Sequence, residues 1–339
     1  MFPVSFAQRI IEEHSNVGDM VLDPFCGRGT TPFVAKSMGR NAVGIDVNPV
    51  GWIFAKVKTD PYHNTEKLLV RLRELLSSVL PVDAKAETDF QKYAWSPNVL
   101  AFLNVARRDL SWRTVKLDRT LMALILVHLH AKLGEGLSNQ MRQSKAMAPE
   151  YAVRWWSSRG MAPPEIDIVD FFRKKFAWRY AQGIPKSSSL ARVYLGDAKS
   201  FKADRLTQKA SLILTSPPYC GVTNYEYDNW IRLWMLGGPS HPCGSARARY
   251  GNRADYRKLI FGVLKKCQHL SLADARIYVR TGASDFDTEV AVEAIQKLWP
   301  KHKISMSFDR PLGPTQTALY GHDWLQQGEM DILATPSCH

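Results

Sequence analysis

The chain has 339 residues, of which 45% are hydrophobic and 23% are charged, a composition that excludes intrinsic disorder and allows one large domain or two smaller ones. Lysine and arginine together outnumber aspartate and glutamate by 45 to 32, so the net charge is +13. An excess of this size favours a polyanionic partner, with nucleic acid as the leading candidate, over a neutral small molecule.

The cysteines and the apolar runs exclude two further classes of protein. The five cysteines are widely scattered without any C-x-x-C spacing, so they indicate neither a disulfide framework nor a zinc site, and we expect no bound metal. The most apolar stretch, residues 121–133, is too short to cross a bilayer and suits a buried helix. We therefore expect a protein of the reduced cytoplasm.

The first elements in chain order predict a β-α-β unit. A helix covers residues 6–14, and residues 18–39 then read as a turn, a buried strand, a glycine-containing loop and a helix that stops at Gly39. A second short strand follows and ends at Asp46. Parallel strands joined in this way predict a sheet covered by helices, and hence an α/β fold.

The middle of the chain differs in character from its two ends. Between residues 59 and 190, helical periodicity, aromatic side chains and clustered cations dominate, and strand-like alternation is scarce. Strand patterns resume at residues 192–197, 211–219, 275–282, 303–311 and 330–336, and helical patterns at residues 252–270 and 287–299. The sequence therefore predicts a sheet domain in two parts, residues 1–58 and 191–339, interrupted by a helical insertion, residues 59–190.

Acidic residues stand at the ends of three successive predicted strands. Asp23, Asp46 and Asp197 could each be only a turn residue or a helix cap, but together they predict one nucleoside site at the carboxyl edge of the sheet. There Asp46 could accept hydrogen bonds from both hydroxyls of a ribose, and Asp197 one from an adenine amino group. Gly27 and Gly29 would let a ligand approach the backbone, although the third glycine of a dinucleotide fingerprint is absent.

The stretch "TSPPY", residues 215–219, follows the fourth predicted strand. Two prolines cannot donate to a sheet ladder, so in the simplest interpretation they only end the strand. They also hold the backbone extended and leave its carbonyls free to accept hydrogen bonds. With the oxygen of Ser216 and the flat face of Tyr219, the stretch would suit a planar ring that carries an amino group.

Together, "DPFCGRGTT", "GIDVNP" and "TSPPY" resemble the S-adenosylmethionine-dependent DNA amino-methyltransferases, which modify cytosine N4 or adenine N6. The resemblance covers roughly residues 1–57 and 191–339. It implies a Rossmann-like class I methyltransferase sheet, mostly parallel and of the seven-strand type, with S-adenosylmethionine as cofactor and double-stranded DNA as substrate. It also allows a cognate restriction endonuclease as a second partner.

The resemblance assigns roles residue by residue, and the opening "FPVSFAQRII" is similar to the family's segment that contacts the cofactor carboxylate. The implied catalytic motif consists of Ser216, Pro217, Pro218 and Tyr219. The implied cofactor-binding residues are Phe2, Pro3, Asp23, Pro24, Phe25, Cys26, Gly27, Gly29, Thr30, Thr31, Asp46, Asn48 and Asp197. No metal ligand is implied.

The chemistry of the motif follows from the weak nucleophilicity of an exocyclic amine, whose lone pair is delocalised into the ring. If Ser216 Oγ and the Pro217 carbonyl accept its two protons, the nitrogen is drawn toward tetrahedral geometry and its lone pair toward the methyl donor. Tyr219 can stack on the ring. The base has to leave the duplex to reach these groups, which costs about a few kcal/mol, and stacking offsets about 1–3 kcal/mol.

Two regions are candidates for contacting DNA. The helical insertion, residues 59–190, lies between the cofactor loop and the catalytic motif and is the first candidate for target recognition, with a structural lid as the rival. The second is the basic segment 245–258, in which a phosphate-contacting loop competes with a solvated face; its cations are Arg247, Arg249, Arg253, Arg257 and Lys258. Of Tyr225, Tyr227 and Trp230, we expect most in a helix core and one beside the base.

Serine in the first position of the motif resembles the cytosine-N4 members, which makes N4 of cytosine the expected target and N6 of adenine the alternative. RNA guanine-N2 methyltransferases, which pair a similar loop with a Pro-Pro-Tyr motif, are a second alternative. A degenerate fold that only binds DNA is a third. Cytosine-C5 methylation is discounted, because the Pro-Cys pair in "HPCGS" at 241–245 lacks the rest of that family's signature.

Overall fold

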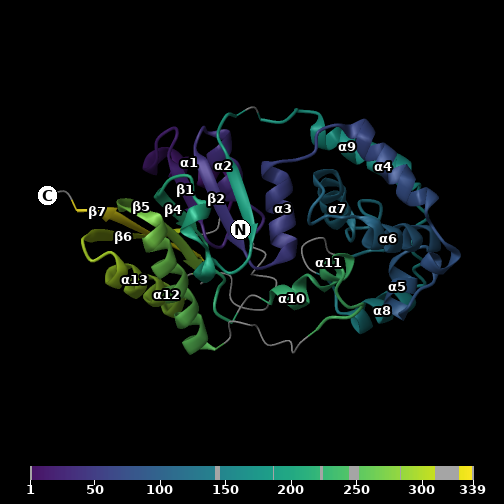
Figure 1. Ribbon diagram of the computed structural model, residues 1–339. Coiled ribbons are helices and arrows are strands. Elements are labelled where there is room, and N and C mark those ends of the chain that lie inside the picture. Colours follow the sequence, from purple (N-terminus) through teal and green to yellow (C-terminus); the bar gives the residue numbers. More distant parts are fainter. Residues whose placement is uncertain are drawn as a thin grey trace. The chain divides into compact units, whose positions relative to one another are not determined.

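The computed structural model describes residues 2–141, 146–185, 187–221, 224–243, 252–282, 284–309 and 328–337. The chain divides into two compact units, labelled element by element in Figure 1. The sheet unit comprises Met1–Thr59, Lys186–Thr223 and Arg247–His339, and the helical unit comprises Asp60–Pro185 and Asn224–Ala246. In the described part of the chain, no helix has the length and apolar character needed to span a membrane.

The sheet unit is built on a seven-stranded sheet with the order β3-β2-β1-β4-β5-β7-β6. Strand β7 runs antiparallel to both neighbours, and the other neighbouring strands are parallel. This arrangement confirms the predicted Rossmann-like class I methyltransferase sheet. The strands are β1 (Met20–Asp23), β2 (Asn41–Asp46), β3 (Ala191–Leu195), β4 (Ala210–Thr215), β5 (Ser271–Gly282), β6 (His302–Asp309) and β7 (Glu329–Pro336).

The central strands are buried on both faces, and successive residues contribute to opposite cores. Val21 and Leu212 pack in the core that also holds α1 residues such as Ile10, whereas Leu22 and Ile213 pack in the core that holds residues of α12 and α13. Figure 1 places α12 and α13 together on one side of the sheet. The helices of this unit are α1 (Val4–His14), α2 (Thr30–Ser37), α3 (Pro49–Thr59), α12 (Arg253–Leu270) and α13 (Asp285–Leu298), with short 3-10 helices at Ala198–Ser200 and Ala203–Arg205.

The helical unit takes up most of the predicted insertion and also Asn224–Ala246, a segment that the sequence assigned to the second part of the sheet domain. This segment packs in the aromatic core of the unit, where the rings of Trp95 and Trp234 stack with their centroids 5.1 Å apart. The elements are α4 (Thr65–Ser77), a 3-10 helix (Pro81–Ala84), α5 (Asp89–Ala94), α6 (Pro97–Asp109), α7 (Lys116–His128), α8 (Pro149–Ser157), α9 (Ile168–Tyr180), α10 (Tyr225–Asp228) and α11 (Trp230–Met235).

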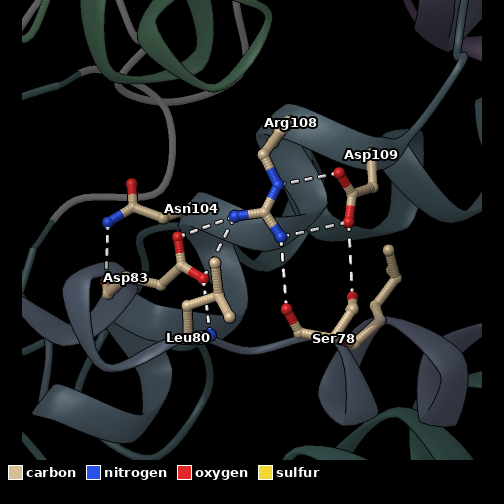
Figure 2. A network of polar contacts seen from close by, with 7 residues as sticks. Ser78, Leu80, Asp83, Asn104, Arg108 and Asp109 are labelled. Atoms are coloured by element: carbon tan, nitrogen blue, oxygen red, sulfur yellow. Dashed lines mark hydrogen bonds and ion pairs between the residues drawn. The ribbon is translucent and has the colours of Figure 1, made fainter.

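A network around Arg108 connects the end of α6 to the segment that follows α4 (Figure 2). Its guanidinium donates to Asp83 Oδ1 at 2.9 Å, to Asp109 Oδ1 at 2.8 Å and to the carbonyl oxygen of Ser78 at 3.2 Å. Asn104, one turn earlier on α6, donates to the backbone oxygen of Asp83 at 2.8 Å. The planar fork of arginine holds three segments at once because its donors point in fixed directions.

Candidate active site

The carboxyl ends of β3, β2, β1 and β4 lie at one edge of the sheet. The register pairs Asp46 at the end of β2 with Leu195 at the end of β3, and Asp23 at the end of β1 with Gly44 of β2. Strand β4 pairs with β1 on its other side, so the motif that begins at Ser216 leaves the sheet at the same edge. The parallel topology thus gathers the predicted site residues, which are far apart in sequence.

The loop between β1 and α2 needs its two glycines for different reasons. Gly29 has a φ of +74°, and a Cβ at this position would lie 2.6 Å from Ala55 Cβ on α3, so the loop and α3 could not approach so closely with another residue. Gly27 has a φ of +49°, and a Cβ there would meet no atom within 4 Å. The backbone of Gly27 therefore faces open space, which is what the approach of a ligand requires.

Asp46 holds this loop in place through both carboxylate oxygens. Its Oδ2 accepts the Gly27 N–H at 2.7 Å, and its Oδ1 accepts the Asn48 N–H at 2.7 Å. Burial raises the pKa of Asp46, and these two hydrogen bonds oppose the rise. Each carboxylate oxygen has a further lone pair, so Asp46 can support the loop and still accept hydrogen bonds from a ligand. Asn48 caps the start of α3 by accepting the Val50 N–H at 2.9 Å.

Asp23 connects the glycine loop to β4 from within the core. It is 3% exposed, and its Oδ1 accepts the Thr215 hydroxyl at 2.7 Å and the Phe25 N–H at 3.1 Å. Burial raises the pKa of Asp23 to about 6, although hydrogen bonds from Thr31, Thr215 and Phe25 act in the opposite direction. This geometry makes Asp23 a residue that fixes the start of the loop against the strand that carries the motif.

The other predicted cofactor residues fall into a buried and an accessible group. Phe2, Pro24, Cys26, Thr30 and Thr31 are buried, whereas Pro3 is exposed and Phe25 and Asn48 are partly exposed. Asp197 is exposed, caps the next 3-10 helix by accepting the Lys199 N–H at 2.9 Å, and lies 3.4 Å from Lys199 Nζ. The local cap and a ligand contact are compatible at Asp197, because its second oxygen accepts no backbone N–H group in the described residues.

The motif itself is partly accessible. Pro217 and Pro218 are buried, while Ser216 and Tyr219 are partly exposed. The Tyr219 hydroxyl donates to Glu329 Oε1 at 3.0 Å, and burial raises the pKa of Tyr219 well above its usual range. Its ring packs against Gly282 at the end of β5, where a Cβ would lie 3.2 Å from the ring. The ring plane and the hydroxyl are thus both held.

Two functional candidates on the neighbouring strands were not predicted from the sequence. Arg280 on β5, 2% exposed, donates to Asp331 at 2.6 Å, to Glu329 at 2.7 Å and to Asp309 at 2.8 Å. Glu329 on β7 therefore joins the buried arginine to Tyr219. The arginine within the apolar pattern "ARIYVRTG" was the available signal, but its partners follow only from the antiparallel pairing of β5 and β7.

A second acid holds the residue after Tyr219. Asp287, in the first turn of α13 and 1% exposed, accepts the Cys220 N–H at 3.2 Å through its Oδ2. Among the described residues, neither its Oδ1 nor the buried hydroxyl of Tyr256 has a hydrogen-bond partner. Burial raises the pKa of Asp287 to about 6, and the hydrogen bond from Cys220 opposes the rise. The segment that follows Pro218 is thus held by two carboxylates, one from β7 and one from α13.

Several residues of the predicted DNA-contacting regions can be located. In the basic segment, Arg247 and Arg249 lie outside the described residues, whereas Arg253 lies over the Phe286 ring at 4.8 Å and Arg257 pairs with Glu293. Trp230 is 3% exposed and belongs to the core of the helical unit, as most of the aromatic residues there were expected to do. The side chain of Tyr225 lies outside the described residues, and Tyr227 is partly exposed.

Comparison with known proteins adds independent information. A family model described as DNA methylase matches residues 1–50. The chain is 41% identical over 271 residues, 70% of its length, to the Type II methyltransferase M.BsoBI of Geobacillus stearothermophilus, of which it covers 51%. It is 50% identical over 46 residues, 14% of its length, to the DNA adenine methyltransferase YhdJ of Escherichia coli, of which it covers 16%.

Among solved structures, the chain is similar to a SAM-dependent methyltransferase of Methanosarcina mazei, with 9% identity, a TM-score of 0.38 and coverage of 100% of this chain and 99% of the other. The chain spans about half the length, or less, of the first curated relatives that it matches.

The burial of Asp23 predicts that the stability of the protein depends on pH. Between its ordinary pKa of 3.8 and its folded pKa of about 6, the folded protein binds a proton that the unfolded chain has released, so stability falls as the pH rises through this interval. Asn at this position cannot titrate. From pH 4 to pH 7, the unfolding free energy of the wild type should therefore fall relative to Asp23→Asn by up to about 3 kcal/mol.

Guanidinium unfolding of both proteins at several pH values measures this difference, and Asp19→Asn, in the turn before β1, is the control. A stability difference between wild type and Asp23→Asn that stays constant with pH would contradict the prediction.

Proposed function

The chain belongs to the family of DNA amino-methyltransferases, and on this premise we propose that it transfers a methyl group from S-adenosylmethionine to N4 of a flipped cytosine in double-stranded DNA. The observation that carries the proposal is the position of the motif Ser216–Tyr219 directly after β4, beside the strand that leads into the Gly27–Gly29 loop. Methyl donor and acceptor would then meet at one edge of the sheet.

The residues present suit S-adenosylmethionine, which supplies an electrophilic methyl group on its sulfonium. The open space in front of Gly27 would admit the methionine part of the cofactor to the loop backbone. The remaining lone pairs of Asp46 would accept the two ribose hydroxyls, and Asp197 would accept the adenine amino group. Phe2, Pro24, Cys26, Thr30 and Thr31, which are buried, would support this surface from behind, and the exposed Pro3 would lie toward the cofactor carboxylate.

Within the motif, each residue would have a separate task. Ser216 Oγ and the Pro217 carbonyl would accept the two protons of the target amine and so direct its lone pair at the methyl carbon. Tyr219 would stack on the flipped ring, and the two prolines would keep the carbonyl free of a sheet partner. Water exclusion is supported by the burial of Pro217 and Pro218.

The choice of N4 over N6 rests on serine in the first position of the motif. A carboxylate or an amide there is more usual among the adenine-N6 members of the family, so adenine N6 is the alternative. Both products can be identified directly. Sequencing DNA from an expressing host for modified bases would locate the target site, and mass spectrometry of the nucleosides should find N4-methylcytosine. N6-methyladenine alone would overturn the base assignment and leave the enzyme class in place.

Ser216→Ala should lower the single-turnover rate of methyl transfer severely, by at least about 100-fold, because a transition-state interaction is lost. The affinity for S-adenosylmethionine should stay nearly unchanged, since Ser216 is not assigned to the cofactor. Ser211→Ala, near the start of β4, is the matched control and should transfer methyl groups at the wild-type rate. Wild-type turnover in the Ser216 variant would refute the mechanism.

Asp46→Ala should weaken S-adenosylmethionine binding by at least about 10-fold, because a hydrogen bond to a charged acceptor contributes about 1.5–3 kcal/mol and the support of the Gly27 N–H is also lost. Isothermal titration calorimetry measures the affinity, with the exposed Asp204→Ala as control. An unchanged dissociation constant in the Asp46 variant would remove Asp46 from the cofactor site.

For target recognition we propose the helical unit, and within it the outer face of α9. Phe172 and Phe176 point into the core, whereas Arg173, Lys174, Trp178 and Arg179 are exposed. Asp170 pairs with Arg173 at 3.2 Å and with Lys174 at 2.7 Å and neutralises part of this charge. Trp178 is 71% exposed and lies under the Arg179 guanidinium at 5.3 Å. An exposed aromatic ring can stack on a base, and the neighbouring cations can contact phosphate groups.

Trp178→Ala should weaken DNA binding by about 5- to 100-fold, the range that corresponds to the loss of one stacked base. Trp178→Phe keeps a stacking face and is the matched variant, which should retain most of the affinity. Fluorescence anisotropy with duplex DNA at several salt concentrations measures both, and the salt slope should be close to that of the wild type because no cation is removed. Equal affinities for all three proteins would exclude α9, and tighter binding of RNA than of duplex DNA would favour the RNA alternative.

A cognate restriction endonuclease remains part of the proposal as a second partner, as does a cytoplasmic location. DNA binding by the wild type without any methyl transfer would instead support the degenerate fold that acts only as a DNA-binding protein.

A further inference from the structure

Helix α8 of the helical unit has one packed face and one open face. Ala152 and Trp156 are fully buried on the packed face, where the Trp156 ring contacts Phe90 of α5 with centroids 5.5 Å apart. The Trp156 indole also donates to the Gln140 backbone oxygen at 2.9 Å. Figure 1 shows α8 beside α5. Because residues four apart share one side of a helix, these contacts determine which side chains of α8 face outward.

The outer face of α8 combines aromatic rings with cations and consists of Tyr151, Arg154, Trp155 and Arg159. Tyr151 is 53% exposed, and both arginines are exposed as well. Trp155 is partly exposed, and the Arg159 guanidinium lies over its ring, 4.7 Å from the centroid. Arg159 also donates to the Trp155 backbone oxygen at 3.2 Å. The ring and the hydrogen bond together hold this cation on the face.

The charge of this outer face is not neutralised by the protein. Among the described residues, neither Arg154 nor Arg159 forms an ion pair with a carboxylate. The acid of α8 itself, Glu150, is exposed in the first turn. On α9, by contrast, Asp170 pairs with two of the cations. Two unpaired guanidinium groups beside two aromatic rings can contact phosphate groups and stack on bases, which is the combination that unstacked nucleic acid requires.

The chain that follows the catalytic motif holds the start of α8. Within the helical unit, the Ala146 N–H donates to the Asp228 backbone oxygen at 3.1 Å, and the Trp230 indole donates to the Met147 backbone oxygen at 3.0 Å. The segment that contains these partners begins at Asn224, five positions after the motif, and this stretch of chain spans at most about 18 Å. The covalent chain therefore limits how far α8 can be from a base that enters the motif.

Resting on the proposed function, we infer that the outer face of α8 is a second DNA-binding surface, at which the aromatic rings stack on bases left without a neighbour when the target base is flipped. Arg154 and Arg159 bind phosphate groups near that position. Bases inside an intact duplex offer no free face to a side chain. Flipping takes one base out of the stack and so exposes the faces of its neighbours, which an aromatic side chain can then cover.

Arg154→Gln and Arg159→Gln test the phosphate contacts. Each lost contact should reduce the slope of log affinity against log salt concentration by about 0.9 and weaken binding by about 8-fold at 0.1 M salt. Because phosphate contacts carry no sequence information, the loss should be equal on a duplex with the mapped target site and on one without it. Arg113→Gln, which replaces an exposed arginine over the buried Trp112 in the same unit, is the matched control and should bind like the wild type.

Tyr151→Ala tests the stacking separately from the charge. It should weaken binding at least about 5-fold on the duplex with the target site, where a base is flipped, and less than about 2-fold on the duplex without it. The salt slope should stay that of the wild type, because no cation is removed. Tyr151→Phe keeps the ring and is the matched variant. Since the replaced side chains are exposed, all variants should melt close to the wild-type temperature.

Fluorescence anisotropy of the full chain with S-adenosylhomocysteine and each duplex, at several salt concentrations, measures these affinities. Wild-type affinity and salt slope in both arginine variants would overturn the inference. A Tyr151→Ala effect of the same size on the two duplexes, or no effect on either, would overturn the stacking role. A wild type that binds DNA without methylating it would overturn the proposed function, and the salt slopes of the arginine variants would still decide whether α8 binds DNA.

Discussion

The parallel hydrogen bonding of β3, β2, β1 and β4 is the constraint on which the site depends. Parallel neighbours end at the same edge of a sheet, so the side chains that follow them converge whatever their separation in sequence. Asp46 and Ser216 are 170 residues apart in the chain and come to one edge only because β1 pairs with β2 on one side and with β4 on the other. The loops at this edge are then held by short hydrogen bonds such as that from Gly27 to Asp46.

Three buried ionisable side chains near this edge have specific polar partners. Asp23 accepts from Thr215, Asp287 from the Cys220 N–H, and Arg280 lies among three carboxylates. Burying such charges destabilises the fold unless they are paired, and replacing them by apolar residues could improve stability. Their common feature is that they fix the backbone or a side chain next to the motif. We interpret them as the structural basis for holding the site rigid before a substrate binds.

The helical unit combines a packed core with an exposed face on α9. Its core contains a cluster of aromatic rings in which Phe172 contacts Phe102 and Phe176, while cations and Trp178 are exposed on the outer face of α9. The segment Asn224–Ala246, which directly follows the motif residues, belongs to the same unit. The chain therefore passes from the motif Ser216–Tyr219 in the sheet unit into the helical unit within a few residues.

By itself, the sequence predicted the first β-α-β unit, the glycine loop, the acids at the strand ends and the motif Ser216–Tyr219, because each depends on local residue patterns and on the rule that parallel strand ends converge. Only the tertiary structure revealed the contacts of Glu329 with Tyr219 and with Arg280. Glu329 and Arg280 are 49 positions apart in sequence. They meet through the antiparallel register of β5 and β7, which local periodicity does not specify. Likewise, the sequence predicts Asp23 as a cofactor residue, but only the tertiary structure shows that it is buried and accepts a hydrogen bond from Thr215, since burial depends on the whole sheet and its covering helices.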